Sequence, residues 1–285
     1  MMQFLRIPHP HPLVAQPSRS VQNVSASLPF AFSQSSANGD RAQFLAMDPL
    51  LVPRHLAVIM DGNVRWARQR GKLDSDGHDA GAKSLKKLVR LCCQWRIPLL
   101  TVFAFSSDNW SRPRMEVDFL MSLFERVLYS ELQSFDREGI RVSTIGELSS
   151  LPDSLRRLIE RVERTTMNND KLHLIVAINY SGRKSITQAC RNISEKVKLG
   201  VIQQEDVDEV LIDKEMETAS FEFQNPDLLI RAGGEHRLSN FMLWELAYTE
   251  LFFVSTLWPD FSESDLLQAL AAFQMRKRRY GGRPS

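Results

Sequence analysis

The sequence predicts an α/β protein with a six-stranded, mainly parallel sheet surrounded by helices. Short apolar runs alternate with longer segments of helical character, as expected when helices connect parallel strands. No internal repeat interrupts this alternation. The chain has 285 residues, of which 43% are apolar, enough for one large domain with a full hydrophobic core.

The predicted strands are short apolar runs such as Leu56–Ile59, which is continuous enough for a buried strand. The predicted helices are longer, and residues 114–137 carry apolar side chains at near-helical spacing. That apolar face either packs in the core or forms the wall of a hydrophobic tunnel. The predicted strands cover residues 55–60, 99–105, 140–145, 172–178, 227–231 and 251–254. The predicted helices cover residues 64–70, 79–95, 114–137, 152–167, 183–198, 205–219 and 262–279.

Polar residues gather directly after several of the predicted strands. Because ligands of parallel sheets bind beyond the carboxyl ends of the strands, we expect these residues to surround one site. They are Asp61 after the first strand, Ser106–Asn109 after the second, Asn179–Arg183 after the fourth and Arg231–Ser239 after the fifth.

The segment Met60–Ala67 combines an acid, a glycine and an arginine at a strand-to-helix turn. Gly62 allows a sharp turn, and the start of a helix offers free N–H groups to an anion. Arg65 can bind a phosphate with two hydrogen bonds, and Asp61 can hold a Mg²⁺ that contacts the phosphate. These features predict a diphosphate–metal site, although Asp61 could also be a simple helix cap.

Three further segments carry chemically useful side chains. Residues 101–113 are a buried strand followed by Ser-Ser-Asp-Asn-Trp-Ser-Arg, a cluster that also suits a turn or a helix cap. In residues 227–241, a strand ending in Arg231 precedes two glycines, a second arginine and a serine, which together suit a diphosphate. In residues 244–253, Glu250 precedes an apolar strand and either completes a Mg²⁺ site or merely ends the strand.

Together these segments resemble the cis-prenyltransferases, the undecaprenyl diphosphate synthase family. The resemblance extends from about His55 to Arg279 and implies the cis-prenyltransferase fold, a homodimer and Mg²⁺-dependent condensation of isoprenoid diphosphates. The motifs that carry it are MDGNVRWA at 60–67, FSSDNWSRP at 105–113, IRAGGEHRLSNF at 230–241 and WELAYTELFF at 244–253.

The resemblance also implies roles for individual residues. Asp61 would be catalytic and would hold the Mg²⁺, with help from Glu250. The first diphosphate would contact Gly62, Asn63, Val64, Arg65 and His78. The second diphosphate would contact Arg231, Arg237, Leu238 and Ser239. Ser106 and Asn109 would position the second substrate or take part in proton removal, beside Ser107, Asp108 and Arg112. The prenyl pocket would be shaped by Trp66, Phe105 and Trp110.

Three residues depart from the family's usual pattern. Val64 replaces a glycine, and a β-branched side chain there stiffens the backbone beside the phosphate. Asp74 stands where an arginine usually contacts the allylic diphosphate. The exchange removes an attraction and adds a repulsion beside the diphosphate, so either Asp74 points away or the first site works differently. A third alternative is that the loop is mobile and its acids are solvated. Asp79 also stands where a basic or neutral residue is more usual.

An altered first site beside an intact second site resembles the short-chain enzymes of plant plastids, among them lavandulyl diphosphate synthase. The preferred function is therefore head-to-middle coupling of two dimethylallyl diphosphates to lavandulyl diphosphate. The first alternative is regular cis-condensation of dimethylallyl and isopentenyl diphosphate to neryl or cis,cis-farnesyl diphosphate. The second is a non-catalytic partner subunit of a long-chain cis-prenyltransferase. Such subunits usually lack the acid that this chain retains as Asp61.

Composition narrows the remaining possibilities. The net charge of +2 does not indicate a nucleic-acid partner, and no apolar run is long enough to predict a transmembrane segment. Residues 1–46 contain seven serines and a single acid, Asp40, as organelle transit peptides do. We therefore predict a transit peptide or a disordered tail at 1–46, one cis-prenyltransferase domain at 47–285 and a location in the plastid stroma.

Overall fold

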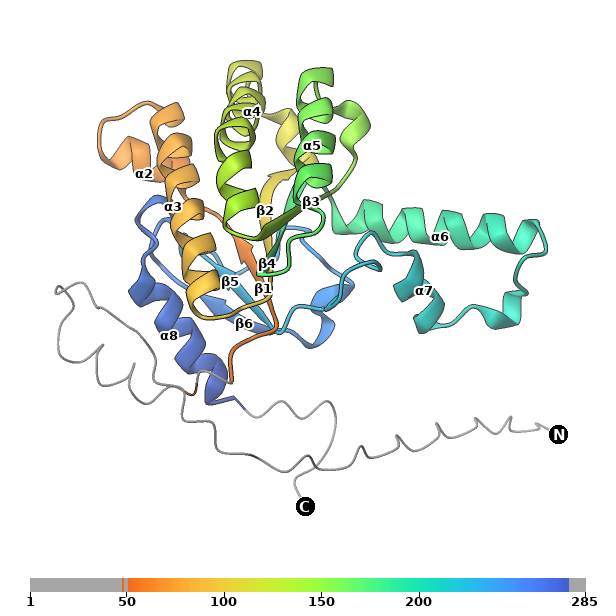
Figure 1. Ribbon diagram of the computed structural model, residues 1–285. Coiled ribbons are helices and arrows are strands. Elements are labelled where there is room, and N and C mark those ends of the chain that lie inside the picture. Colours follow the sequence, from red (N-terminus) through yellow and green to blue (C-terminus); the bar gives the residue numbers. More distant parts are fainter. Residues whose placement is uncertain (1–47, 49–50, 277–285) are drawn as a thin grey trace. The chain divides into compact units, whose positions relative to one another are not determined.

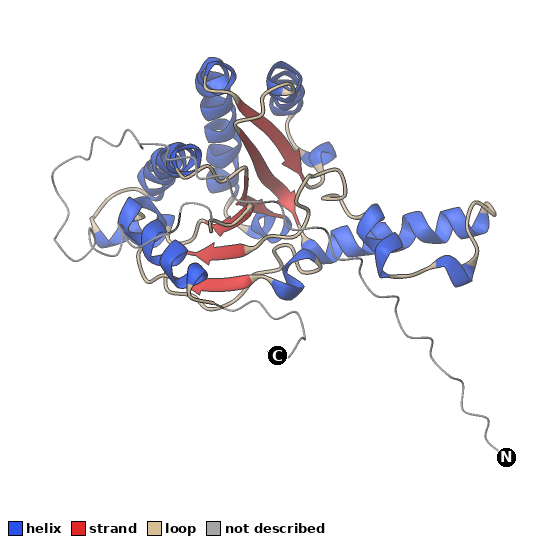
Figure 2. Cartoon of the chain, turned by 60° about the horizontal axis from the view of Figure 1, so that its bottom comes forward, coloured by secondary structure: helices blue, strands red, loops and turns tan. Residues whose placement is uncertain are grey.

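The computed structural model describes Asp48 and residues 51–276, which all belong to one compact unit, Asn38–Ser285. The predicted transit segment 1–46 lies outside the described residues. Six strands form one sheet in the order β3-β4-β2-β1-β5-β6, and every neighbouring pair is parallel. The predicted fold class is confirmed, and within the described part of the chain the sheet is entirely parallel (Figures 1 and 2).

The strands and helices follow the predicted alternation. The strands are β1 (His55–Ile59), β2 (Leu99–Ser106), β3 (Ile140–Ile145), β4 (Leu172–Tyr180), β5 (Leu228–Arg231) and β6 (Glu250–Phe253). The α-helices are α2 (Asn63–Gln69), α3 (Asp74–Gln94), α4 (Arg114–Arg137), α5 (Asp153–Thr166), α6 (Gly182–Lys198), α7 (Glu209–Glu215) and α8 (Glu263–Gln274). The short 3-10 turns are η1 (Ser107–Ser111), η2 (Leu148–Ser150), η3 (Gln204–Asp206), η4 (Glu245–Tyr248) and η5 (Trp258–Asp260).

The two faces of the sheet bury different parts of the chain. Leu56 and Val58 of β1 point to one face, where they join a core built with α3, α4, α5 and α8. Ala57 and Ile59 point to the other face, where Phe241 and Met242 pack. Alternate side chains of a strand point to opposite faces, so a strand as continuously apolar as β1 is buried on both sides. Figure 1 shows α6 and α7 extending away from the sheet.

The strand order determines where a ligand can enter. β1 pairs with β2 on one side and with β5 on the other, so the connections reverse direction beside β1. Such a reversal leaves a crevice outside the carboxyl ends of the neighbouring strands. Ile59, the last residue of β1, is aligned with Arg231, the last residue of β5, so the polar segments that follow β1 and β5 begin side by side.

Three predicted helices differ from the structure by more than one residue, and one of them is α8, which ends at Gln274 rather than at 279. Helix α3 begins at Asp74 rather than 79, because Asp76 accepts the Leu73 N–H at 3.1 Å and two acids in the first turn complement the helix dipole. The predicted helix 205–219 is shorter in the structure and corresponds to α7. Asp208 is the N-cap of α7 and accepts the Leu211 N–H at 2.8 Å, so the helix begins after it. Within residues 51–276, no helix is long and apolar enough to cross a membrane.

The pairing of β2 with β4 is irregular near the carboxyl ends. Phe103 is aligned with Ala177 and Phe105 with Ile178, which leaves Ala104 without a partner on β4. A bulge bends a strand and redirects its side chains. Consecutive residues of β2, which would otherwise alternate between the two faces of the sheet, therefore line one cavity (next section).

Candidate active site

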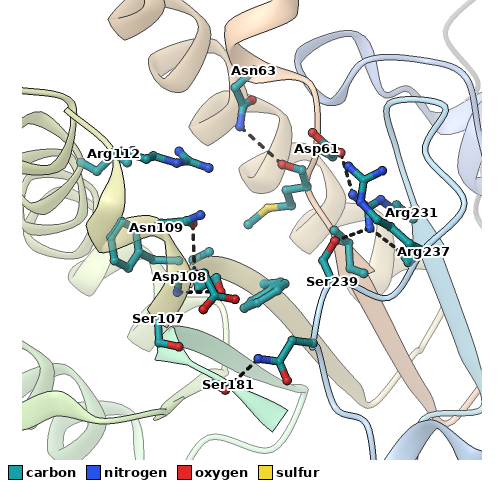
Figure 3. A pocket seen from close by; sticks show the side chains of 18 of the residues that line it. Asp61, Asn63, Ser107, Asp108, Asn109, Arg112, Ser181, Arg231, Arg237 and Ser239 are labelled. Atoms are coloured by element: carbon teal, nitrogen blue, oxygen red, sulfur yellow. Dashed lines mark hydrogen bonds and ion pairs between the residues drawn. The ribbon is translucent and has the colours of Figure 1, made fainter. Parts of the chain in front are cut away.

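A cavity of about 1030 Å³ lies at the carboxyl ends of β1, β2 and β5 (Figure 3). It brings together most of the residues that the sequence predicted for the site. The predicted residues that line it are Asp61, Gly62, Asn63, Val64, Arg65, His78, Phe105, Ser106, Ser107, Asp108, Asn109, Arg112, Arg231, Arg237 and Ser239. Asp61 and Arg231, for example, are 170 residues apart in the sequence, and the parallel register of the sheet unites them.

Asp61 and Arg231 form a charged pair at the centre of the cavity wall. The Asp61 Oδ2 accepts a hydrogen bond from Arg231 Nη2 at 2.9 Å, and the Arg231 side chain is only 3% exposed. The same guanidinium donates through Nη1 to Ser239 Oγ at 2.8 Å and to the carbonyl of Arg237. A buried, rigid arginine therefore orders both the acid after β1 and the loop after β5.

Helix α2 begins at Gly62 without a side-chain cap. Gly62 is the N-cap and has a φ of 106°, a left-handed conformation that favours glycine. Asp61 therefore does not cap this helix, which rules out the simple-cap interpretation of its carboxylate. The side chain is 29% exposed and reaches into the cavity, where it can meet a ligand.

Arg65 reaches back from α2 to the loop after β5. Its Nη2 lies 3.2 Å from Asp61 Oδ1, and its Nη1 donates to the carbonyl of Gly233 at 2.8 Å. A Cβ added at Gly233 would lie 2.7 Å from Arg65 Nη2 and 3.0 Å from the Asp61 carbonyl. Glycine at 233 is therefore what lets the β5 loop approach the motif after β1 so closely.

The turn after β2 is both a cap and a cavity wall. Ser106 Oγ accepts the Asp108 N–H at 3.2 Å, and Asn109 Oδ1 accepts the Ser106 N–H at 3.1 Å. These bonds hold η1 in the conformation that presents Ser107 and Asp108 to the cavity (Figure 3). The turn interpretation and the site interpretation of this segment are therefore compatible.

His78 lies on the opposite wall, on α3. It is 7% exposed, and its Nε2 is 3.4 Å from Glu116 Oε1, which also accepts from Arg112 Nη1 at 2.9 Å. Burial lowers the pKa of His78, and the neighbouring Glu116 opposes part of that shift. His78 is therefore favoured as a neutral hydrogen-bonding group at neutral pH.

The remaining wall is apolar. Phe103, Ala104, Phe105 and Leu120 line the cavity between η1 and α4. The ring of Phe105 is buried and packs edge-on against Trp110, with centroids 5.2 Å apart. One end of the cavity is thus charged and the adjoining wall is apolar, which suits a ligand with an anionic head and a hydrocarbon tail.

Three predicted pocket residues do not line the cavity. The Trp66 indole donates to Asp260 Oδ1 at 2.7 Å and stacks under Arg70 outside it. Trp110 lies behind Phe105, and Leu238 packs against the apolar cluster on the other face of the sheet. Residues 63–65 reach the cavity and Trp66 does not, because the contacts with Asp260 and Arg70 hold its ring outside.

Glu250 does not share a metal ion with Asp61 within one chain. It is the first residue of β6 and is aligned with Leu228, at the amino ends of the strands, whereas Asp61 follows the carboxyl end of β1. Its carboxylate pairs with Arg276 Nη1 at 2.6 Å instead. The two acids lie at opposite edges of a parallel sheet, so the predicted contribution of Glu250 is not supported here.

Asp74 also faces away from the cavity. Its carboxylate accepts two hydrogen bonds from Arg68, at 3.1 and 2.8 Å, in the first turn of α3. That hydrogen bonding lowers the pKa of Asp74 and keeps the carboxylate paired. The structure fits the alternative in which Asp74 stays out of the cavity, and the residue lies in the first turn of α3 rather than in a loop, with its side chain 37% exposed.

Several lining residues were not identified from the sequence. Glu116 and Leu120 come from α4, and Lys184 and Asn240 complete the cavity near the start of α6. Lys184 lies just past the predicted polar segment Asn179–Arg183, so the strand-end rule points to its neighbourhood. Glu116 carries no such signal, because only the packing of α4 against α3 brings it to His78.

Comparison with known proteins agrees with this site. Residues 59–281 match the family model of putative undecaprenyl diphosphate synthases. The chain therefore belongs to the undecaprenyl diphosphate synthase, or cis-prenyltransferase, family. As a member of that family it is a prenyltransferase.

Individual relatives agree with the family assignment. The chain is 57% identical to dehydrodolichyl diphosphate synthase 2 of Arabidopsis thaliana over 82% of its length and 76% of the relative. It is 49% identical to the chloroplastic (2Z,6Z)-farnesyl diphosphate synthase CPT6 of Solanum lycopersicum, covering 81% of this chain and 80% of that protein. Further tomato relatives are also named chloroplastic.

A solved structure of the family has the same fold. Lavandulyl diphosphate synthase from Lavandula x intermedia, in complex with dimethylallyl diphosphate, superposes with a TM-score of 0.80. The identity is 41%, and the match covers 81% of this chain and 99% of that structure. The likeness in fold and the family match agree with the cis-prenyltransferase fold that the motifs predicted.

Proposed function

We propose that this chain condenses short isoprenoid diphosphates with the help of Mg²⁺. The observation that carries the proposal is the Asp61–Arg231 pair beside a dry aromatic wall, at the point where the strand order reverses. Acid, guanidinium and hydrocarbon surface are what an anionic head, a metal and a prenyl tail require.

Each of the two diphosphates has its own set of groups. The allylic diphosphate would contact the segment after β1, with Arg65 and the neutral His78 as donors. The second diphosphate would contact Arg237 and Ser239, both of which line the cavity after β5. Arg231 stands between the two sets and bonds to Asp61 on one side and Ser239 on the other.

The donor set of the cavity fits Mg²⁺. No cluster of three or more His, Cys, Asp or Glu side chains that could hold a metal occurs among residues 51–276. Mg²⁺ does not need one, because it keeps several waters and binds through one or two carboxylates together with substrate phosphates. Asp61 is the carboxylate placed for this, and its partly exposed oxygens each retain a free lone pair beside Arg65 and Arg231.

The reaction requires charge stabilisation and exclusion of water. The C–O bond of the allylic diphosphate breaks, a C–C bond forms with the alkene of the second substrate, and that substrate then loses a proton. Arginine donors stabilise the departing diphosphate, and bound Mg²⁺ would add positive charge at the same place. Phe105 and Leu120 shield the allylic cation from water.

The position of Asp74 bears on which of the two coupling modes is favoured. Head-to-middle coupling was predicted partly from Asp74, and Asp74 is paired with Arg68 away from the cavity. Because Asp74 stays out of the cavity, it gives less support to head-to-middle coupling, and regular cis-condensation of dimethylallyl and isopentenyl diphosphate becomes the favoured mode. The relative named (2Z,6Z)-farnesyl diphosphate synthase is consistent with this mode.

Head-to-middle coupling to lavandulyl diphosphate remains the second candidate function. Val64 lines the cavity where the family usually has glycine, and the lavandulyl diphosphate synthase structure is similar over 81% of this chain. Incubating the full chain with labelled dimethylallyl diphosphate, with and without isopentenyl diphosphate, distinguishes the modes. A linear cis product that requires isopentenyl diphosphate supports condensation, a branched C10 product from dimethylallyl diphosphate alone supports coupling, and no product contradicts both.

Two further expectations belong to this proposal. Plastid import is supported by the composition of residues 1–46 and by relatives that are named chloroplastic. Import of the labelled full chain into isolated chloroplasts, with loss of an N-terminal segment, tests it. The homodimer implied by the family resemblance stays a prediction, which sedimentation of the purified protein checks.

A further inference from the structure

Asn179 is the residue at which β4 leaves its regular pairing with β2. Phe105 is aligned with Ile178 and Ser106 with Tyr180, so Asn179 has no partner on β2. Its φ of 54° lies in the left-handed region, where asparagine is enriched among non-glycine residues. The residue is also buried, at 2% exposure. A buried residue in a costly conformation beside a site indicates that surrounding contacts hold it there.

The side-chain amide of Asn179 links three segments. Its Oδ1 accepts the Trp110 indole N–H at 2.8 Å, and its Nδ2 donates to the carbonyl of Glu147 at 2.6 Å. Its own carbonyl accepts the Glu147 N–H at 3.3 Å. These three bonds join the end of β4, the turn η1 and the loop after β3.

Both hydrogen-bond partners of Asn179 contact residues that line the cavity. Trp110 belongs to η1, the turn that presents Ser107 and Asp108, and its ring packs edge-on against Phe105. Glu147 lies 3.5 Å from the ammonium group of Lys184, which lines the cavity at the start of α6. One amide therefore determines the position of two parts of the wall, although Asn179 itself does not line the cavity.

We propose that Asn179 is a positioning residue that holds η1, through the Trp110 indole, in the geometry that receives the second diphosphate substrate. The proposal deepens the proposed function and rests on it. Left-handed φ directs the Asn179 side chain away from the sheet ladder and toward η1. Loss of the amide would remove the acceptor of the part-buried indole N–H, and η1 would lose the bond that ties it to the end of β4.

Steady-state kinetics of the full chain test the proposal with four variants. Asn179→Gly tolerates the left-handed backbone but deletes both side-chain bonds, and Asn179→Asp keeps the acceptor for Trp110. Trp110→Phe removes the donor, and the fourth variant combines Asn179→Gly with Trp110→Phe. We expect Asn179→Gly to raise the KM of the second substrate about tenfold, as for loss of the two part-buried side-chain hydrogen bonds, with a smaller change for the allylic substrate. Asn179→Asp should recover only part of the loss, because it keeps the acceptor for Trp110 but not the donor to the Glu147 carbonyl.

The double variant separates positioning from general destabilisation. If Asn179 acts through the indole, Asn179→Gly combined with Trp110→Phe should be no worse than the more impaired single variant. Multiplicative losses, or a KM within twofold of wild type in Asn179→Gly, would overturn the proposal. Asn169→Ala is the matched control, because Asn169 also donates from a side-chain amide to main-chain carbonyls, but at the amino ends of the strands rather than at their carboxyl ends.

A spectroscopic measurement decides the positioning role without turnover. The chain has five tryptophans, and Trp110→Phe assigns the indole N–H resonance of Trp110 in a ¹H–¹⁵N spectrum. Asn179→Gly should shift that resonance and leave the others in place, whereas Asn169→Ala should not move it. An unchanged Trp110 resonance would contradict the proposal. If the wild-type protein shows no prenyl transfer, the proposed function is wrong. The Trp110 resonance would still show whether Asn179 holds η1 in place.

Discussion

Replacing Asp61 by alanine should lower the stability of the protein as well as its activity. The carboxylate accepts Arg231 Nη2 at 2.9 Å and lies 3.2 Å from Arg65 Nη2. Because Arg231 is almost completely buried, the alanine variant would leave its guanidinium without a nearby countercharge. Two functions of one carboxylate, supporting Arg231 and binding metal, would therefore be lost together.

The expected loss follows from opposing electrostatic terms. Unit charges 2.9 Å apart attract by about 6 kcal/mol at an effective dielectric constant of 20. In the wild type, desolvation of Arg231 offsets most of this, whereas removing one partner of a buried pair costs about 3–5 kcal/mol. Asp61 is partly exposed and Arg231 keeps its bond to Ser239, so we expect the smaller loss of about 2 kcal/mol in the free energy of unfolding.

Urea unfolding and turnover measured on three variants separate the two functions. Asp61→Ala should be less stable than wild type, and combining it with Arg231→Met should recover part of the loss because no buried charge remains. Asp61→Asn keeps an acceptor oxygen and should lose less stability, yet turnover should fall at least about a thousandfold because the charged metal ligand is gone. Asp74→Ala, which removes an exposed acid paired with Arg68, is the control and should lower the urea midpoint much less than Asp61→Ala does.

Two results would refute this reasoning. An Asp61→Ala protein as stable as wild type would show that Arg231 does not depend on the carboxylate. Turnover of Asp61→Asn within about tenfold of wild type, a barrier change of only ~1.4 kcal/mol, would show that Asp61 does not hold an essential metal.

Three further predictions follow from the described contacts. Burial lowers the pKa of His55 from 6.5 to about 4, so the imidazole is neutral in both the folded and the unfolded chain above pH 6.5. Below pH 6.5 the unfolded chain takes up a proton that the folded chain does not, and the protein loses stability as the pH falls toward 4. The free energy of unfolding should fall by about 3 kcal/mol over that range, and His55→Gln should flatten this dependence in urea titrations. Gly233→Ala should lower kcat/KM and stability because its Cβ would collide with Arg65. Gly200→Ala is the control, because a Cβ there meets no atom within 4 Å and should cost only backbone strain of about 1 kcal/mol. Arg237→Ala should weaken an unreactive thiolo analogue of the second substrate more than an allylic one in separate titrations, and equal weakening would contradict the assignment.

Local patterns predicted the sheet and the general position of the site. Each apolar run became a strand, because continuous burial on both faces of a parallel sheet leaves a clear signal in the sequence. The residues after β1, β2 and β5 could be grouped before any coordinates, because parallel strands end at one edge. Strand alignment confirms that grouping, with Ile59 beside Arg231.

Other features could not be read from the sequence. Which side chains of the short helix α2 face the cavity depends on how α2 packs against α3. Helix α3 approaches α2 so closely at Gly77 that an added Cβ would lie only 2.1 Å from the Asn63 carbonyl. The orientation of α2 is therefore set by residues outside its own motif. The direction of Trp66 follows from that packing and is not encoded by its motif.

The charges illustrate the same division between sequence and tertiary structure. Sequence determined that Asp74 replaces a usual arginine and that Glu250 is an acid near the end of the motif series. Tertiary structure decided that Asp74 pairs with Arg68 and that Glu250 pairs with Arg276 at the opposite edge of the sheet from Asp61. A residue type and its local spacing define which chemistry is available. Only the packing of helices and the direction of each strand decide which charges meet, because electrostatic pairing depends on distances that the linear chain does not contain.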